Sequence, residues 1–305
     1  MHRHRPDRSR LAAVAIGVSI LLAPPPAAAQ APWNGPTGER LDLSRAPGTS
    51  ANLGPLGHGV IWGVDSGNHT GASVLWKLTL DTPELDKIGS TGVYEMTDIA
   101  FFPDGRLFGV SYTDLYTVDK TTGAATLVGS LGRNDVVALI SDSSGHLYAG
   151  ALDGSFLLID PDKVPPKVTV VGNNGGALNS SGDLAFDPTT GKLYGTSKSS
   201  GNDKLIKVNV QTGVATLIGD LQYPQAYGLA YGFDSLLYGV VLGENDGLSN
   251  PNLGPGLVRI DTTTGTPTPL ATLGTDGMYG FAREILIFKD GFQTGNTSRW
   301  SQTAG

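Results

Sequence analysis

Two aspartates at equivalent positions of a repeated strand pattern are the side chains best placed to do chemistry. Asp98 begins the stretch DIAFFPDG and Asp183 begins DLAFDPTTG, so their carboxylates occupy the same place in two similar strands. If those strands surround one axis, both carboxylates could approach a hard cation such as Ca²⁺, which prefers oxygen ligands. Alternatively, each carboxylate accepts hydrogen bonds from backbone N–H groups at the start of its strand. An oxygen cage for calcium needs more than two ligands, so we expect no bound cofactor. If calcium is bound, Asp98 and Asp183 are its candidate ligands.

Aromatic and acidic residues stand close to these aspartates in the pattern. Tyr94 and Glu95 lie shortly before Asp98, and Tyr227 and Tyr279 each stand one residue ahead of the matching place in their own strands. Side chains that converge from several strands can form a concave ligand site. We therefore predict a ligand-binding site composed of Tyr94, Glu95, Asp98, Asp183, Tyr227 and Tyr279.

Other combinations of reactive side chains are weaker. His58, Asp65 and His69 mix imidazole with carboxylate, but they are spread over a strand and a Gly-rich loop, whereas zinc needs three or four fixed ligands. The stretch ENDG at 244–247 lacks the alternating Asp/Asn series and the terminal Glu of a calcium loop. There is no Cys and no G-x-S-x-G motif, so the sequence predicts no catalytic residue.

The elements that carry these residues form a repeat with a period of 40–46 residues. A strand of the LYG type recurs as IWGVD, LFGVS, LYAGA, LYGTS and LYGVV, starting at residues 61, 107, 147, 193 and 237. We call this LYG-type strand b. In four repeats an apolar strand, a, and a turn rich in Asp, Pro, Ser and Gly precede strand b. Two further strands, c and d, follow each strand b. Four short strands at this period are typical of a β-propeller, so we predict an all-β fold.

The strand count predicts five blades over residues 58–286. The first unit lacks its own strand a, and GMYGFAREILIF, from Gly277, supplies the missing strand at the far end of the chain. We expect this segment to close the ring by pairing with the first unit, which removes exposed sheet edges. A six-bladed propeller is one alternative, if residues 35–57 and 284–290 contribute strands. Two stacked β-sandwiches are a second alternative.

The turns of the repeat differ in length between the two faces of such a ring. The a–b and c–d turns are short and uniform, as in VQTGVATLIGD (210–220), whose Gly213 we assign to a structural hairpin. The b–c connections at 66–73, 197–204 and 242–256 are long and varied. Long loops on a rigid scaffold often carry binding, so we expect a ligand or protein partner on this long-loop face. Tolerated insertions are the alternative.

The N-terminus has the features of a secretory signal peptide. A start with four Arg is followed by the apolar run 11–23 and by small residues, which predicts cleavage after Ala29, or alternatively after Ala31. A retained membrane anchor is the alternative, but no other segment approaches transmembrane length. We expect residues 30–57 to form a linker, and the mature chain to be secreted, either periplasmic or extracellular, or associated with the cell surface.

Net charge excludes one class of partner. Removal of residues 1–29 takes away four Arg and one Asp, which leaves 17 basic and 27 acidic side chains and a formal charge of −10. Binding of nucleic acid requires clustered Lys and Arg, so no nucleic acid partner is expected. Anionic membrane surfaces are disfavoured for the same reason. We expect a monomer.

The repeated GxLYG, L(I/V)xID and TGxAT(L/V)IG elements resemble those of secreted bacterial propeller-repeat proteins, in the broad group of NHL, YncE-like and lactonase-like propellers. The resemblance covers about 230 residues of this sequence and implies the fold. Some members of that group are enzymes with a metal at the channel. The tail IFKDGFQTGNTSRWSQT, within 287–305, resembles a short C-terminal element of exported bacterial proteins, with Gln293 where that element usually has Glu.

These observations favour a secreted, non-catalytic propeller that binds a ligand or protein on its long-loop face. A metal-dependent hydrolase or lactonase with a site at the channel mouth is one alternative. A structural surface protein is the other.

Overall fold

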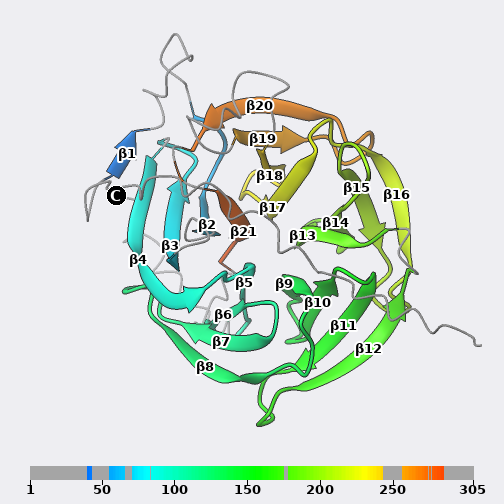
Figure 1. Cartoon of the computed structure of the whole chain (residues 1–305). Helices are drawn as coiled ribbons and strands as arrows, with labels where there is room; N and C mark the ends of the chain where they lie inside the picture. Colours follow the sequence, from blue (N-terminus) through cyan, green and yellow to red (C-terminus); the bar gives the residue numbers. More distant parts are fainter. Residues whose placement is uncertain are drawn as a thin grey trace, which may run out of the picture. The chain divides into compact units, whose positions relative to one another are not determined.

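The computed structural model shows an all-β propeller (Figure 1). It describes residues 40–42, 55–65, 71–82, 84–174, 178–242, 256–273, 275 and 277–284. These residues form five antiparallel sheets arranged radially around an axis, and no helix occurs among them. The prediction of five four-stranded blades is confirmed. The predicted signal peptide (1–29) and C-terminal tail (287–305) lie outside the described residues.

Blade 1 joins the two ends of the described chain. Its strands β2 (Val60–Asp65), β3 (Ala72–Thr79) and β4 (Glu84–Tyr94) are completed on the inner side by β21 (Met278–Ala282). β21 runs antiparallel to β2, with Gly63 opposite Phe281. The ring is therefore closed by the C-terminal strand, as the match between YGFA and YGLA predicts.

A short strand from the expected linker extends the same blade outward. β1 (Arg40–Asp42) pairs antiparallel with β4, with Arg40 opposite Asp86. The segment 35–57 thus contributes one edge strand to blade 1. Five sheets account for all the described strands, so the six-blade alternative is not adopted.

Blades 2 to 5 each contain four consecutive strands, ordered from the axis outward. Blade 2 comprises β5 (Asp98–Phe101), β6 (Leu107–Val110), β7 (Asp114–Val118) and β8 (Ala125–Ser130). Blade 3 comprises β9 (Val136–Ser141), β10 (Leu147–Ala151), β11 (Ser155–Asp160) and β12 (Lys167–Asn173). Blade 4 comprises β13 (Ser180–Phe186), β14 (Leu193–Ser197), β15 (Lys204–Val208) and β16 (Ala215–Asp220). Blade 5 comprises β17 (Gln225–Tyr231), β18 (Leu237–Leu242), β19 (Gly256–Ile260) and β20 (Pro267–Thr272).

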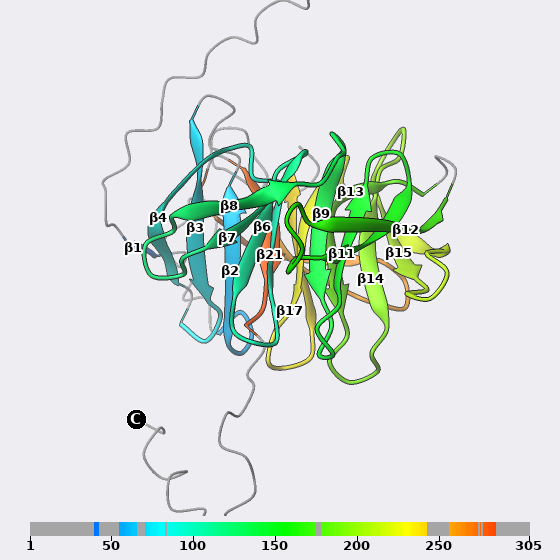
Figure 2. The ribbon, with the colours of Figure 1, turned by 90° about the horizontal axis from the view of Figure 1, so that it is seen from below.

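The hydrophobic core lies between neighbouring blades. Inner strands such as β5 and β10 are buried along their whole length, because both faces of each sheet are covered by other sheets. One core cluster joins blade 1 to blade 5 through Tyr238 and Phe281, both fully buried. Seen from the side, inner strands such as β9 and β17 run along the axis, whereas outer strands such as β8 and β12 run across it (Figure 2). We call the end with the a–b and c–d turns the short-turn end, and the opposite one the long-loop end.

Glycines in three outer strands allow their blades to touch the next one. A Cβ atom on Gly219 of β16 would lie 1.7 Å from the carbonyl oxygen of Thr264, in the c–d turn of blade 5. Two other blade pairs show the same contact: Gly89 with Thr122, at 2.1 Å, and Gly172 with Thr212, at 2.0 Å. The glycines of the TGxAT(L/V)IG element are therefore required by this close approach between backbones, in addition to the turn itself.

We expect Gly219→Ala to lower the free energy of unfolding by about 3 kcal/mol, because the added methyl group overpacks a contact with rigid backbone. Gly201→Ala is the matched control, since a Cβ there meets nothing within 4 Å and the residue has no left-handed φ. Urea unfolding of both variants measures the difference. Equal midpoints for the two would show that the blades do not approach each other as closely as described.

Candidate functional site

The structure brings Asp98 and Asp183 together at the centre of the propeller. Asp98 begins β5, Asp183 lies within β13, and both side chains have no exposed surface. Their carboxyl groups lie close enough to influence each other's ionisation. The repeats predict their equivalent positions, but their contacts extend well beyond their own strands.

Asp98 accepts hydrogen bonds from two blades. Its Oδ1 accepts from the backbone N–H of Ile99, at 2.7 Å, in its own strand. Its Oδ2 accepts from the N–H of Leu139 in blade 3, at 2.6 Å. Asp98 therefore connects blade 2 to blade 3 at the axis.

Asp183 accepts hydrogen bonds from three blades. Its Oδ1 accepts from the N–H of Leu184, at 2.5 Å. Its Oδ2 accepts from Leu229 in blade 5, at 2.6 Å, and from Phe281 in blade 1, at 2.8 Å. The innermost strand of each sheet has an unpaired edge facing the axis, whose N–H groups need acceptors. Together the two aspartates accept one N–H from every blade: Ile99, Leu139, Leu184, Leu229 and Phe281.

The other three blades carry small residues at the equivalent position, which leaves space for the two carboxyl groups. These residues are Ala138, Gly228 and Gly280. A Cβ on Gly280 would lie 2.2 Å from Oδ1 of Asp98, so a larger side chain there would displace the pair. Two aspartates and three small residues thus fill the channel at this level.

Burial raises the pKa of both carboxyl groups well above the usual value for Asp. For Asp98, the negative charge of Asp183 adds to this rise, because two ionised carboxyl groups side by side repel each other. The five N–H donors stabilise negative charge on the pair. This arrangement suits a structural connection at the axis, and the described residues contain no group of three or more His, Asp or Glu side chains that could hold a metal ion.

The predicted tyrosines lie at the long-loop end of the channel. The rings of Tyr227 and Tyr279 meet edge to face, with centroids 5.0 Å apart, and both are half-buried. Burial, with smaller effects of Asp203 and Tyr112, raises the pKa of Tyr227 to about 12. Tyr112 therefore belongs to this mouth as well, a residue that sequence reasoning missed.

Tyr94 and Glu95 lie at the same mouth. Tyr94 is 53% exposed, and Glu95 adopts a left-handed φ of 50° at the connection from β4 to β5. Burial raises the pKa of Tyr112, with further contributions from Glu95 and Tyr94. The six predicted site residues therefore divide into a buried aspartate pair and a tyrosine-rich mouth. The loops 66–70, 175–177 and 243–255 at this end lie outside the described residues.

The residues considered for zinc take part in separate contacts. His58 Nδ1 pairs with Asp81, whereas Asp65 accepts from the N–H of Val74 and the indole Nε1 of Trp76, both at 2.8 Å. His69 and the ENDG stretch lie outside the described residues. In the part of the chain that the structure describes, no helix is long and apolar enough to cross a membrane.

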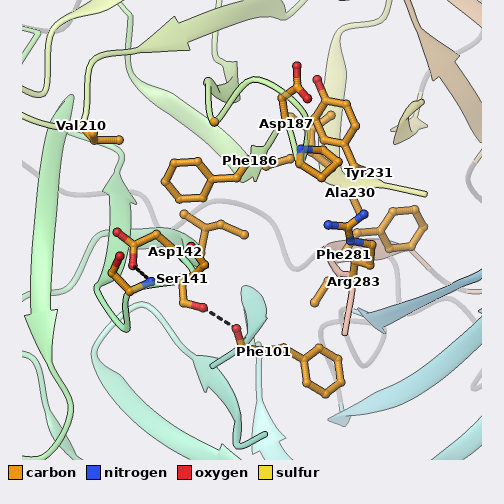
Figure 3. A pocket seen from close by; sticks show the side chains of 18 residues that line it. Phe101, Ser141, Asp142, Phe186, Asp187, Val210, Ala230, Tyr231, Phe281 and Arg283 are labelled. Atoms are coloured by element: carbon orange, nitrogen blue, oxygen red, sulfur yellow. Dashed lines mark hydrogen bonds between the residues drawn. The ribbon is translucent and has the colours of Figure 1, made fainter. Parts of the chain in front are cut away.

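A pocket of about 450 Å³ opens at the short-turn end of the channel (Figure 3). The ends of all five innermost strands line it, together with the a–b turns of blades 3 and 4. Leu229 and Phe281, whose N–H groups bind Asp183, also line it, so the aspartate pair lies behind its inner end. Four aromatic residues are among those that line it; Phe186 is partly exposed, whereas Phe101, Tyr231 and Phe281 are almost fully buried.

Arg283 is the one cationic residue among the described residues that line this pocket. Its Nη1 donates to the carbonyl of Gly232, at 3.2 Å, and its guanidinium lies 5.5 Å from the ring centroid of Phe233. No described carboxylate pairs with Arg283. The adjacent Glu284 pairs with Lys120 instead. Burial lowers the pKa of Arg283, but a guanidinium remains protonated at neutral pH.

The acidic residues of the pocket already have local partners. Asp142 accepts from the N–H groups of Ser144 and His146, both at 2.9 Å, and pairs with the imidazole of His146. Asp187 accepts from the N–H of Thr189, at 2.8 Å. Figure 3 shows Ser141 and Asp142 on one side of the pocket, and Arg283 with Tyr231 on the other. The charge of Arg283 therefore stays uncompensated within the described pocket.

Sequence reasoning did not identify this pocket, because the short turns suggested hairpins without a site. A signal was present in the last residue of each strand a. In the aligned repeats that place is occupied by Phe101, Ser141, Phe186, Tyr231 and Arg283. Four large side chains, one of them cationic, at one level of a five-bladed ring indicate a chemically distinct mouth.

The topology defines the class of protein, a five-bladed β-propeller closed by its C-terminal strand. No family model matches the sequence, and neither does any curated protein. Similarity to solved structures is distant. A nidogen/laminin complex has 13% identity and a TM-score of 0.47, with 75% of this chain and 82% of the other covered.

Two further solved structures show comparable similarity. TolB from Acinetobacter baumannii has 17% identity and a TM-score of 0.45, and the alignment covers 72% of this chain and 54% of TolB. Virginiamycin B lyase from Staphylococcus aureus has 15% identity and a TM-score of 0.42, with 80% and 77% covered. These similarities assign no activity, so a functional proposal has to rest on the pocket.

Proposed function

We propose that this protein is an exported β-propeller that binds a small organic ligand in the pocket at the short-turn end, without converting it. The carrying observation is the pocket itself, built from the ends of five buried strands and containing a cation that no described carboxylate pairs. Its volume of about 450 Å³ lies in the range of about 300–1,000 Å³ usual for small-molecule sites. Export rests on the signal-peptide features of residues 1–29.

The polar groups of the pocket support binding over catalysis. Nucleophilic catalysis needs a hydroxyl within reach of a general base. The Ser141 hydroxyl instead donates to the carbonyl of Phe101, at 2.5 Å, and the nearby Asp142 is engaged by its own turn. The rigid inner strands would hold a ligand without a large rearrangement, as pre-formed sites do.

A substitution at the pocket edge tests this proposal. Val210 lines the pocket, whereas Val214, in the same c–d hairpin, is 57% exposed and does not. We expect Val210→Trp to occupy part of the pocket and to weaken ligand binding at least ten-fold. Val214→Trp is the matched control, with the same change of side chain, and should bind as the unaltered protein does.

The measurement is a thermal-shift screen of small organic compounds against the mature protein, followed by titration of each hit against both variants. Hits that lose affinity only in Val210→Trp support the proposal. The proposal fails if no compound stabilises the protein. It also fails if the compounds bind Val210→Trp as tightly as the unaltered protein but bind Tyr94→Ala more weakly. That result would place the site at the long-loop mouth.

A further inference from the structure

We infer that the ligand of this pocket is a monocarboxylic acid with a flat aromatic body, whose carboxylate binds Arg283. This inference rests on the proposed function and names the chemistry of the same site. It follows from three properties of the described pocket: a guanidinium without a described counter-charge, a partly exposed aromatic ring in the lining, and carboxylates at the edge.

The guanidinium of Arg283 has unused hydrogen-bonding capacity. Arg carries five N–H donors in a planar fork, and here one hydrogen bond is described, to the carbonyl of Gly232. A half-buried cation without a counter-charge is costly, and burial already lowers the pKa of Arg283. A ligand carboxylate would accept two parallel N–H bonds from the fork and restore the missing charge.

The walls select the body of the ligand. Phe186 presents a partly exposed ring to the pocket, Phe101 and Phe281 lie almost fully buried behind its wall, and Tyr231 lies on the same side as Arg283 (Figure 3). Aromatic side chains bind flat rings through stacked or edge-to-face contacts, which add to simple burial of apolar surface. A flat apolar ring can therefore pack against Phe186.

The charge at the edge limits the ligand to one negative charge. Two carboxylates, Asp142 and Asp187, line the same pocket that holds one guanidinium. A phosphate with two charges would meet more repulsion from these carboxylates than a single carboxylate does. Backbone N–H groups often hold phosphates, but the five N–H groups nearest the axis already donate to Asp98 and Asp183. A monocarboxylate requires only Arg283.

The test is calorimetric titration with aryl carboxylates of one to three rings, such as naphthalene-2-carboxylate, next to the matching carboxamides and aryl phosphates. We expect at least one carboxylate to bind, with its carboxamide and phosphate at least ten-fold weaker. Arg283→Gln should weaken the carboxylate at least ten-fold. Arg283→Lys, which keeps the charge but loses the fork, should fall between.

Arg259→Gln is the matched control, because Arg259 is exposed on β19 and does not line the pocket. Thermal melting of each variant confirms that it is folded. The inference is wrong if no carboxylate binds, if the carboxamide binds equally well, or if Arg283→Gln leaves affinity unchanged. If only neutral compounds bind and Val210→Trp weakens them, the carboxylate inference is wrong but the pocket remains the binding site. If Val210→Trp leaves the affinity of the bound compounds unchanged, the proposed function is wrong as well.

Discussion

Asp183→Ala should lower the free energy of unfolding by about 4 kcal/mol or more. The substitution leaves three buried N–H groups, those of Leu184, Leu229 and Phe281, without an acceptor. Each buried, unsatisfied donor costs about 1–3 kcal/mol. Since a domain has a total stability of about 5–15 kcal/mol, this one change removes a large part of it. Chemical denaturation of the mature protein measures the loss.

Asp187→Ala is the control for this prediction. Asp187 lies four residues further along blade 4 and accepts hydrogen bonds within its own exposed turn. Its removal should shift the denaturation midpoint far less than Asp183→Ala does. Similar shifts for the two variants would contradict a structural role for the aspartate pair, as would retention of full stability in Asp183→Ala.

Removal of the closing strand should abolish the cooperative fold. A chain ending at residue 276 lacks β21, so it exposes the inner edge of β2 and removes the Phe281 N–H from Asp183. An unpaired edge next to an opened apolar core promotes association between chains. We expect this chain to aggregate and to show no sharp melting transition. Circular dichroism melting and gel filtration measure both effects.

A chain ending at residue 286 is the matched control for the closing strand, because it retains β21 and lacks the tail. It should melt cooperatively at a temperature close to that of the mature protein. A sharp transition and a monomeric elution volume for the chain ending at 276 would contradict closure by β21.

The architecture is predictable from the sequence, because the same pattern of strands and turns recurs several times along the chain. The match between YGFA at the end of the chain and YGLA in blade 5 is enough to indicate the closing strand. The edge strand β1 is harder to predict, since its pairing with β4 depends on a contact between distant segments rather than on local periodicity.

The site is only partly predictable. Equivalent placement of Asp98 and Asp183 is visible in the repeats, but their bonds to Leu139, Leu229 and Phe281 come from other blades. Apolar periodicity indicates which face of a strand is buried and does not show which residues meet around an axis. Arg283 was missed for this reason, because it follows the strand that completes blade 1 and lines a pocket with residues from four other blades.

The aspartate pair also separates the two ends of the channel. Tyrosines occupy the long-loop mouth, and the pocket with Arg283 occupies the short-turn end. Both carboxyl groups are fully buried between them, together with Ala138, so a ligand at one end would not contact a ligand at the other.

The most direct test of ligand binding at the short-turn end is a crystal structure of the mature protein with a bound aryl carboxylate, such as naphthalene-2-carboxylate. We predict density for the carboxylate within hydrogen-bonding distance of the Arg283 guanidinium, with the ring system against Phe186. Density at the mouth formed by Tyr94, Tyr112 and Tyr227, with an empty pocket at Arg283, would contradict the account.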